Sequence, residues 1–205
     1  MKLGDFSLGL FEDAGWVSSM SAILCAKALA GASIQEASAW SGVPGTVALV
    51  QALLQGRAAK LNVSSAGLWV RLAVQVTAMH ACFTGADHAD LAMRAIVVWS
   101  AVNFATMVAV PEHALKVWGK SSPTTEDVLT IRLLGFQVGC YAAALASLLY
   151  GNPPATALGH ACLVVVAWAL DNIFVSKGSE KMGVPLGGTY AWLGIASGVV
   201  AFTLF

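Results

Sequence analysis

Several segments of this chain run for about twenty residues with almost no charged side chain, and they constrain the fold more than any other feature. A helix needs about 20 predominantly apolar residues to cross the hydrocarbon core of a bilayer. Four segments meet that length, and a fifth carries no charge at all. The five predicted spans are Gly67 to Ala86, Leu91 to Val110, Val128 to Tyr150, Pro154 to Ser176, and Leu186 to Phe205.

The composition supports lipid as the solvent for much of the 205-residue chain. Hydrophobic residues make up 58% of it and charged residues only 11%, with a mean hydropathy of +0.74. Soluble domains carry about 25% charged residues, so this chain has too little polar surface to cover a globule in water. Eleven basic residues balance eleven acidic ones, which excludes the basic excess that nucleic-acid binding requires. The sequence therefore predicts an all-α, polytopic transmembrane bundle.

The amino-terminal third gives a weaker signal. The segment from Gly15 to Ala32 is apolar but contains Lys27 and three serines, so we expect either a sixth span or an interfacial helix. The segment from Val43 to Leu54 is too short to cross, and we expect a short helix at the membrane surface. This reading divides the chain into residues 1–62, with these two helices, and residues 63–205, the transmembrane bundle.

The connections and their charges give independent support for the five spans. Asp87-His88-Ala89-Asp90 and Gly151-Asn152-Pro153 are tight turns, whereas residues 111–127 form a longer polar loop. Threading the spans alternately places six basic residues on one face, against Arg94 alone near the other, which also receives Asp87 and Asp90. The six are Arg57, Lys60, Lys116, Lys120, Lys177 and Lys181. This positive-inside asymmetry assigns the basic face to the cytosolic, stromal or matrix side.

Charged residues of the amino terminus and of the spans also follow this threading. If Gly15 to Ala32 crosses, we expect Asp5, Glu12 and Asp13 on the acidic face. The charges within the spans lie near one face or the other, where long side chains reach the headgroups. These are Arg71, Arg94, Arg132 and Asp171. The sequence thus predicts an electrically neutral interior, which lowers the expectation of a transporter.

Five uncharged polar residues remain inside the spans as candidate cofactor ligands: Gln75, His80, Asn103, Gln137 and His160. Imidazole nitrogen, amide oxygen or a bound water can supply an axial ligand to a magnesium tetrapyrrole, which suggests chlorophyll. A haem held by paired histidines is a second use. Alternatively, these side chains hydrogen-bond to a neighbouring helix or to backbone. No catalytic motif is present in the sequence, so we expect neither enzymatic activity nor a metal-ion site; the four cysteines are widely spaced.

Small residues recur every four positions along the span from Val128 to Tyr150. The stripe consists of Gly135, Gly139, Ala143, Ser147 and Gly151. Another helix backbone can approach such a stripe closely. Its partner is either a helix of this chain or another membrane-protein subunit, and we expect such subunits to dock there. Gly194 and Gly198 form a shorter version on the last span.

Three short segments resemble a loosely defined group of small polytopic membrane proteins from eukaryotic algae. They are Pro111-Glu112-His113-Ala114-Leu115-Lys116-Val117-Trp118-Gly119, then Arg132-Leu133-Leu134-Gly135, then Pro154-Ala155-Thr156-Ala157-Leu158-Gly159. The resemblance covers about residues 111–176, and some proteins of this kind are peripheral photosystem subunits. The Glu-plus-Arg pairing of chlorophyll a/b-type antenna proteins is absent from this sequence.

The resemblance implies a non-catalytic accessory subunit of a photosystem-type assembly in the thylakoid membrane of a plastid. Such a subunit stabilises contacts between core and antenna, and chlorophyll, carotenoid and lipids are the expected ligands. Two alternatives stay open. One is a small transporter or channel with a path lined by Gln75, His80, Asn103 and Gln137. The other is an accessory subunit of a respiratory complex in the mitochondrial inner membrane, or a membrane haem protein.

Overall fold

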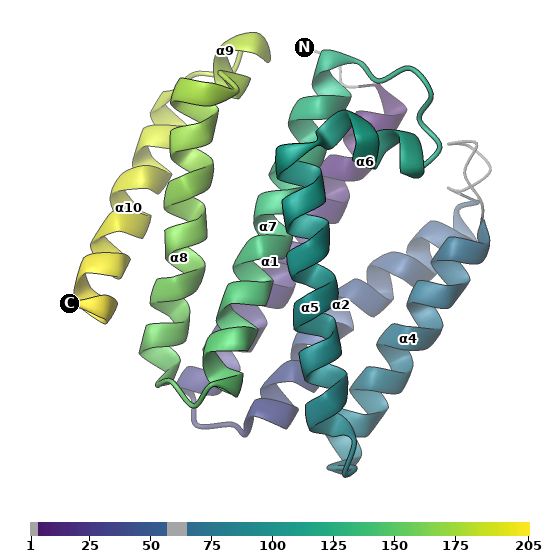
Figure 1. Ribbon diagram of the computed structural model, residues 1–205, viewed down its shortest axis with the longest axis vertical. Helices are drawn as coiled ribbons and strands as arrows, with labels where there is room; N and C mark the ends of the chain where they lie inside the picture. Colours follow the sequence, from purple (N-terminus) through teal and green to yellow (C-terminus); the bar gives the residue numbers. More distant parts are fainter. Residues whose placement is uncertain (1–3, 57–64) are drawn as a thin grey trace.

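All regular structure in residues 4–56 and 65–205, which the computed structural model describes, is helical. Seven long helices alternate in direction along the chain (Figure 1). They are α1 (Asp5–Leu29), α2 (Ile34–Leu54), α4 (Ser65–Thr84), α5 (Ala89–Ala109), α7 (Thr125–Leu149), α8 (Pro154–Leu170) and α10 (Gly187–Leu204). Three short pieces join them: α6 (Pro111–Val117), the π-helix η1 (Asp171–Val175) and α9 (Gly178–Lys181). The predicted all-α bundle is confirmed.

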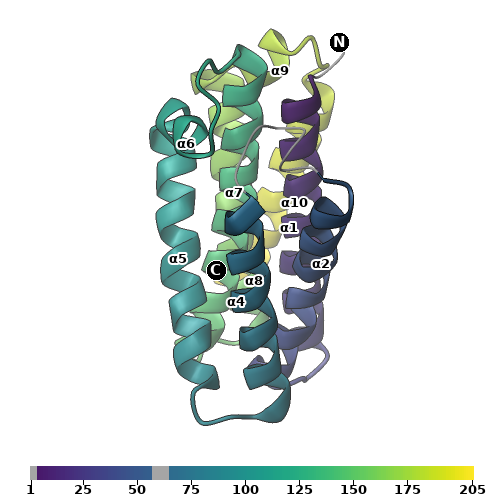
Figure 2. The ribbon, with the colours of Figure 1, turned by 90° about the vertical axis from the view of Figure 1, so that its right-hand side faces the viewer.

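Five helices in the described part of the chain are long and apolar enough to cross a membrane, and the chain is therefore an integral membrane protein. These are Ile34–Leu54, Ala89–Ala109, Thr125–Leu149, Pro154–Val175 and Gly187–Leu204. Four of them match predicted spans. Helix α4, which corresponds to the predicted span from Gly67 to Ala86, is not hydrophobic enough to be among the five. It lies between α2 and α5 (Figure 2).

The prediction of a short surface helix from Val43 to Leu54 is wrong, because α2 begins nine residues earlier, at Ile34, and has 21 residues. Ser33 caps its start by accepting a hydrogen bond from the amide of Glu36 at 3.1 Å. Pro44 lies inside the helix, where it removes a single backbone donor. Neighbouring helices cover the backbone at this point, with Gly42 against Met79 of α4. Packing therefore stabilises α2 across Pro44, although proline ends many other helices.

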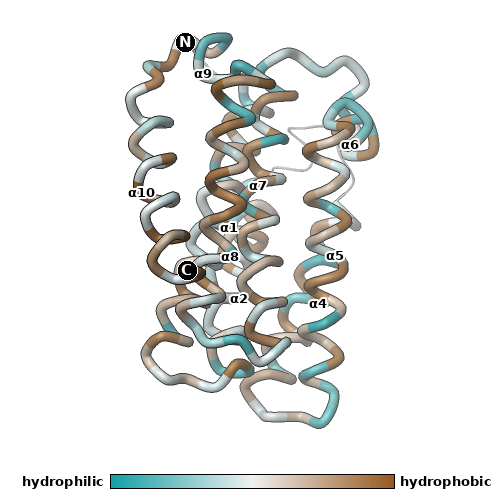
Figure 3. The backbone as a smooth tube through the Cα atoms, turned by 60° about the vertical axis from the view of Figure 1, so that its left-hand side comes forward, coloured by the Kyte–Doolittle hydropathy of each residue, from teal (hydrophilic) through white to brown (hydrophobic). Residues whose placement is uncertain are grey.

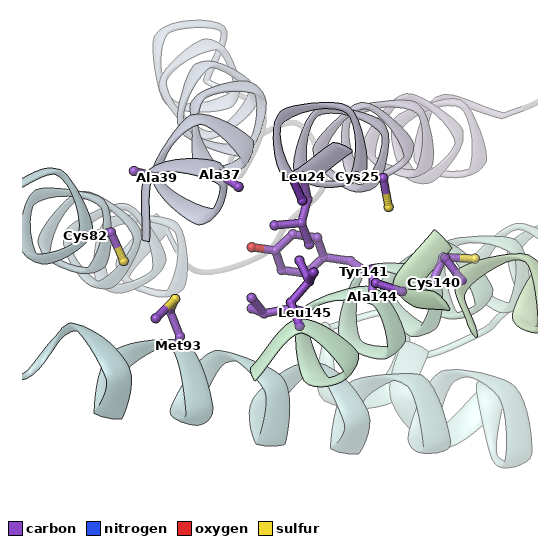
Figure 4. Packing of buried hydrophobic residues seen from close by; sticks show 14 of the residues in the cluster. Leu24, Cys25, Ala37, Ala39, Cys82, Met93, Cys140, Tyr141, Ala144 and Leu145 are labelled. Atoms are coloured by element: carbon purple, nitrogen blue, oxygen red, sulfur yellow. The ribbon is translucent and has the colours of Figure 1, made fainter. Parts of the chain in front are cut away.

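Helix α7 is central, with α1, α5 and α8 packed against it. Leu24 of α1, Met93 of α5, and Tyr141 and Leu145 of α7 meet in the larger of two hydrophobic clusters (Figure 4). Because α1 shares this cluster, a division at residue 62 does not separate two packing units. The most hydrophilic backbone segments gather in the connections and in α6 and α9, at the ends of the bundle (Figure 3).

We call the end of the bundle that carries Lys116, Lys120, Lys177 and Lys181 the lysine end, and the end with the turns at residues 85–88 and 150–153 the turn end (Figure 1). Arg57 and Lys60 lie outside the described residues. Among the residues that the structure does place, the lysine clustering follows the predicted threading.

The amino-terminal acidic residues lie at the lysine end, which corrects the prediction that they fall on the opposite face. Helix α1 starts at the lysine end with Asp5, and Lys120 lies over the ring of Phe6 at 5.0 Å (Figure 1). Lys27, in the last turn of α1, and Arg94, near the start of α5, both lie at the turn end, where Lys27 pairs with Glu36 and Arg94 with Asp90. The physical cause is α2, a long helix that the sequence analysis did not count as a span and that adds one reversal of chain direction between α1 and α4.

The crossing of α2 can be tested with short epitope tags inserted ahead of Gly4, after Gly31 and after Ser121. We expect the first and third tags to be accessible from one side of a sealed membrane and the tag after Gly31 from the other, as judged by antibody binding before and after permeabilisation. Tags ahead of Gly4 and after Ser121 on opposite sides would show that α2 does not cross.

Candidate functional site

The five predicted cofactor ligands lie on four helices and do not converge. Gln75 and His80 are on α4, Asn103 on α5, Gln137 on α7 and His160 on α8. Helix α4 packs against α2, and α8 packs against α7 and α10, so α4 and α8 stand apart in the bundle (Figure 1). His80 and His160 therefore form no paired-histidine haem site within the chain.

Three of these residues make hydrogen bonds between helices. Gln75 Nε2 donates to the Gly42 carbonyl at 3.3 Å, linking α4 to α2. Gln137 Oε1 accepts from Ser18 Oγ at 2.7 Å, linking α7 to α1. A third bond joins α8 to α7.

That third bond, 2.9 Å long, joins His160 Nδ1 to Ser147 Oγ. Asn103 instead donates to the carbonyl of Trp99 in its own helix at 2.7 Å. Gln75, His80, Asn103 and Gln137 thus occupy separate positions and line no common path. The side chain of His80 is exposed on α4, whereas the other four candidate ligands are partly buried.

The small-residue stripe on α7 is covered by helices of the chain itself, so it is not the docking face for another subunit that the sequence predicts. A Cβ atom added at Gly139 would lie 2.7 Å from the ring of Phe104, and one at Gly135 would lie 2.8 Å from Cβ of Met107, both on α5. Ser147 faces His160 of α8. The stripe ends at Gly151, whose φ of +80° closes the turn into α8.

A matched pair of glycine substitutions separates packed from open positions. Gly139→Leu should lower the free energy of unfolding by about 1 to 3 kcal/mol or more, because the new side chain overlaps Phe104. A Cβ added at Gly194 on α10 meets no atom within 4 Å, so Gly194→Leu should leave stability nearly unchanged. Unfolding of the purified chain in detergent, followed by circular dichroism, measures both, and equal effects would contradict this packing.

A largely buried ion pair between Arg132 and Asp171 lies within the spans, and the sequence did not predict that these two residues meet. Arg132 of α7 and Asp171, the first residue of η1, join side by side, with Nη2 donating to Oδ1 and Nε donating to Oδ2. A third nitrogen, Nη1, donates to the Val108 carbonyl of α5 at 2.6 Å. The side chains are only 17% and 12% exposed. One guanidinium therefore ties α5, α7 and α8 together.

This pair corrects the expectation that Arg132 and Asp171 extend separately to the headgroups. Arg132 is seven residues into α7, about 10 Å along the helix axis. A charge at that depth is costly unless it is paired. The sequence signal that could have found it is the presence of one cation and one anion at similar distances from the same membrane face.

The π-helix orients the residues beside this pair. Asp171 faces α7, while the next residue, Asn172, accepts from the Ser179 amide at 2.9 Å and donates to Thr189 of α10 at 3.0 Å. A π-helical turn inserts an extra residue into a helix and so changes which way successive side chains point. Successive residues thereby secure α8 to two different neighbours.

Two further groups of contacts fix the lysine end. Asp127 closes the capping box of α7 with Thr124 and accepts from Ser7 Oγ of α1 at 2.7 Å. Lys120 lies 3.4 Å from the same carboxylate. Arg71 of α4 lies over the ring of Trp118 at 4.9 Å, so it too is engaged within the chain.

The ion pair predicts a stability effect that a double-mutant cycle can isolate. Asp171→Asn leaves Arg132 buried without its counter-charge and should lower the free energy of unfolding by about 3 to 5 kcal/mol. Arg132→Met combined with Asp171→Asn should cost less than Asp171→Asn alone, because both charges are removed.

The control for this cycle is the exposed pair of Arg94 and Asp90, whose nitrogen and oxygen lie 2.7 Å apart with side chains 52% and 56% exposed. Arg94→Ala should change stability little, since exposed pairs contribute weakly. Denaturant unfolding in micelles measures the stability of all variants. A loss of stability in Asp171→Asn as small as that in Arg94→Ala would contradict a stabilising role for the pair of Arg132 and Asp171.

No group of three or more His, Cys, Asp or Glu side chains in the described part of the chain is arranged to hold a metal ion. Comparison with protein-family models, with curated proteins and with solved structures finds no match.

Proposed function

We propose that this chain is a non-catalytic accessory subunit of a larger membrane assembly, in which it holds neighbouring subunits together. The observation that carries the proposal is the outer face of α10. This helix packs mainly on α8, where Gly159 fits closely against Thr203 and Leu204. The other side of α10 faces away from the bundle (Figure 1).

Small residues follow that outer face for the length of α10. With 100° between successive helical residues, Gly187, Ala191, Gly194 and Gly198 lie opposite the buried face. That buried face contains Thr189, Ala196 and Val200. A Cβ added at Gly187, Gly194 or Gly198 meets nothing within 4 Å. Large side chains flank the glycines, with Ile195 60% exposed and Phe202 92% exposed.

This arrangement supports a helix of another subunit as the neighbour of α10. Between membrane helices, close backbone approach over small residues provides the packing energy. The stripe on α7 already has this kind of partner in α5, whereas the face of α10 has none among the described residues. We therefore propose the outer face of α10, in place of the α7 stripe expected from the sequence, as the docking surface.

The assembly we propose is of the photosystem type, in the thylakoid membrane, with chlorophyll and carotenoid as ligands beside lipids. Support for this comes from the resemblance of residues 111–176 to the algal proteins, and the wide apolar outer surface suits such ligands. A respiratory assembly is the alternative, and the identity of the partners in the purified complex distinguishes the two.

Co-migration in mild detergent tests the proposal. We expect the native chain to migrate with a larger assembly on blue native gels. Combining Gly194→Leu with Gly198→Leu should release it as a free chain, because the leucines block close helix approach. The matched control is Gly15→Leu, at another exposed helical glycine with nothing within 4 Å of an added Cβ.

Two outcomes would contradict the proposal. One is a native chain that always migrates at its monomer mass of 21.2 kDa plus detergent. The other is release by Gly15→Leu to the same extent as by the α10 double variant, which would show a general loss of folding. Circular dichroism of each purified variant separates misfolding from loss of docking.

A further inference from the structure

A hollow of about 600 Å³ lies at the turn end, between the start of α2 and the end of α4. The 21 residues of α2 span about 30 Å, which is the thickness of the hydrocarbon core, so the start of α2 lies at the membrane face. Polar side chains supply much of the lining. The lining residues are Ser33, Gln35 and Glu36 of α2, Cys82, Phe83 and Thr84 of α4, and Gly85.

The hollow offers hydrogen-bonding groups without an unpaired charge. Its one charged lining residue, Glu36, pairs with Lys27 of α1, whose amine nitrogen lies 3.6 Å from the carboxylate oxygen. None of the described lining residues is Lys or Arg, so the hollow presents no cation to a phosphate group. The side-chain amide of Gln35 has no hydrogen-bond partner among the described residues. Such a lining suits an uncharged ligand with several hydroxyl groups, because each hydroxyl both donates and accepts.

One aromatic ring completes the lining of this hollow. Phe83 is 50% exposed and meets Trp40 of α2 edge-on, with ring centroids 5.6 Å apart. Lys27 Nζ lies 4.9 Å from the centroid of the Trp40 ring, so contacts with two other helices orient Trp40. The C–H face of a sugar ring that packs on Phe83 removes apolar surface from water, while the sugar hydroxyls reach the polar lining.

An apolar surface continues from the hollow along the outer side of α2. With 100° between successive residues, Trp40 and Val47 lie within about 40° of Glu36 around the helix, and both are exposed. Half of the hydrocarbon core is about 15 Å thick, which corresponds to about ten residues of helix. An acyl chain that starts beside Glu36 therefore ends near Val47. A second hollow, of about 450 Å³, begins there and is lined by Val47 and Val50 among others.

We infer that this hollow and the outer side of α2 bind one membrane lipid with an uncharged sugar headgroup. The headgroup lies in the hollow, where its hydroxyls bond to Gln35, Glu36 and Thr84 and its ring packs on Phe83. One acyl chain follows the outer side of α2 to Val47. Lipids are among the ligands of the proposed function, but this site does not depend on docking at α10.

Binding of defined lipids to the purified full chain tests this assignment. The delipidated chain in detergent is titrated separately with monogalactosyl diacylglycerol, phosphatidylcholine and phosphatidylglycerol that carry the same acyl chains, and native mass spectrometry counts the bound lipids. We expect one equivalent of the galactosyl lipid to bind, and both phospholipids to bind at least about tenfold more weakly at this site.

A pair of variants locates the lipid in the hollow. Combining Gln35→Leu with Thr84→Val should weaken binding of the galactosyl lipid by at least about tenfold, because two hydrogen-bonding groups are removed. The matched control is Thr106→Val on α5. The hydroxyl of Thr106, like that of Thr84, donates to the carbonyl four residues earlier in its helix, and this variant should bind the lipid like the native chain.

The outcomes separate this inference from the proposed function. Equal binding of the three lipids by the native chain, or a preference for either phospholipid, overturns the assignment, and this comparison of headgroups needs no variant. Equal binding of the galactosyl lipid by the native chain and the double variant overturns it too. The α10 variant, Gly194→Leu with Gly198→Leu, should still bind the lipid. A native chain that binds the galactosyl lipid but migrates alone supports the lipid site and contradicts the subunit role.

Discussion

Hydrocarbon cannot hydrogen-bond to a polar group, and this constraint decides how the bundle is built. Every backbone amide in a span must be satisfied by its own helix, and every deep side-chain donor or acceptor must find a partner. Helix α7 meets the constraint for much of the chain, because α1, α5 and α8 all pack on it. From α7, Gln137 bonds to α1, Ser147 bonds to α8, and Arg132 bonds to α5 as well as to Asp171 at the end of α8.

The two kinds of polar contact stabilise the bundle in different ways. The neutral bonds of Gln75, Gln137 and His160 each contribute modestly and orient helix pairs. The pair of Arg132 and Asp171 is costly to break, because removing one partner leaves the other charge buried and unpaired. It connects α5, α7 and the end of α8 through one side chain. The glycines of α7 make these bonds geometrically feasible, since α5 approaches closely at Gly135 and Gly139. Packing and polar bonding therefore depend on each other.

The same constraint distinguishes the inside of the bundle from the outer face of α10. Inside the described bundle, Gly135 and Gly139 pack against α5, and Gln137 and His160 bond to neighbouring helices. Outside, the glycines of α10 have no neighbouring helix within the described part of the chain.

The sequence by itself determined the helical class, four of the five helices that qualify as spans, the tight turns and the clustering of lysines, because hydropathy, turn residues and charge act locally. Only the tertiary structure decided that α2 is one continuous helix of 21 residues, since the packing of Gly42 against Met79 of α4 stabilises it across Pro44. It also decided that the α7 stripe is filled, that Arg132 meets Asp171, and that His80 stays outside. These outcomes depend on which helices become neighbours. Neighbouring helices are set by contacts between residues more than a hundred positions apart, such as Ser18 and Gln137, and these contacts form only when the chain folds.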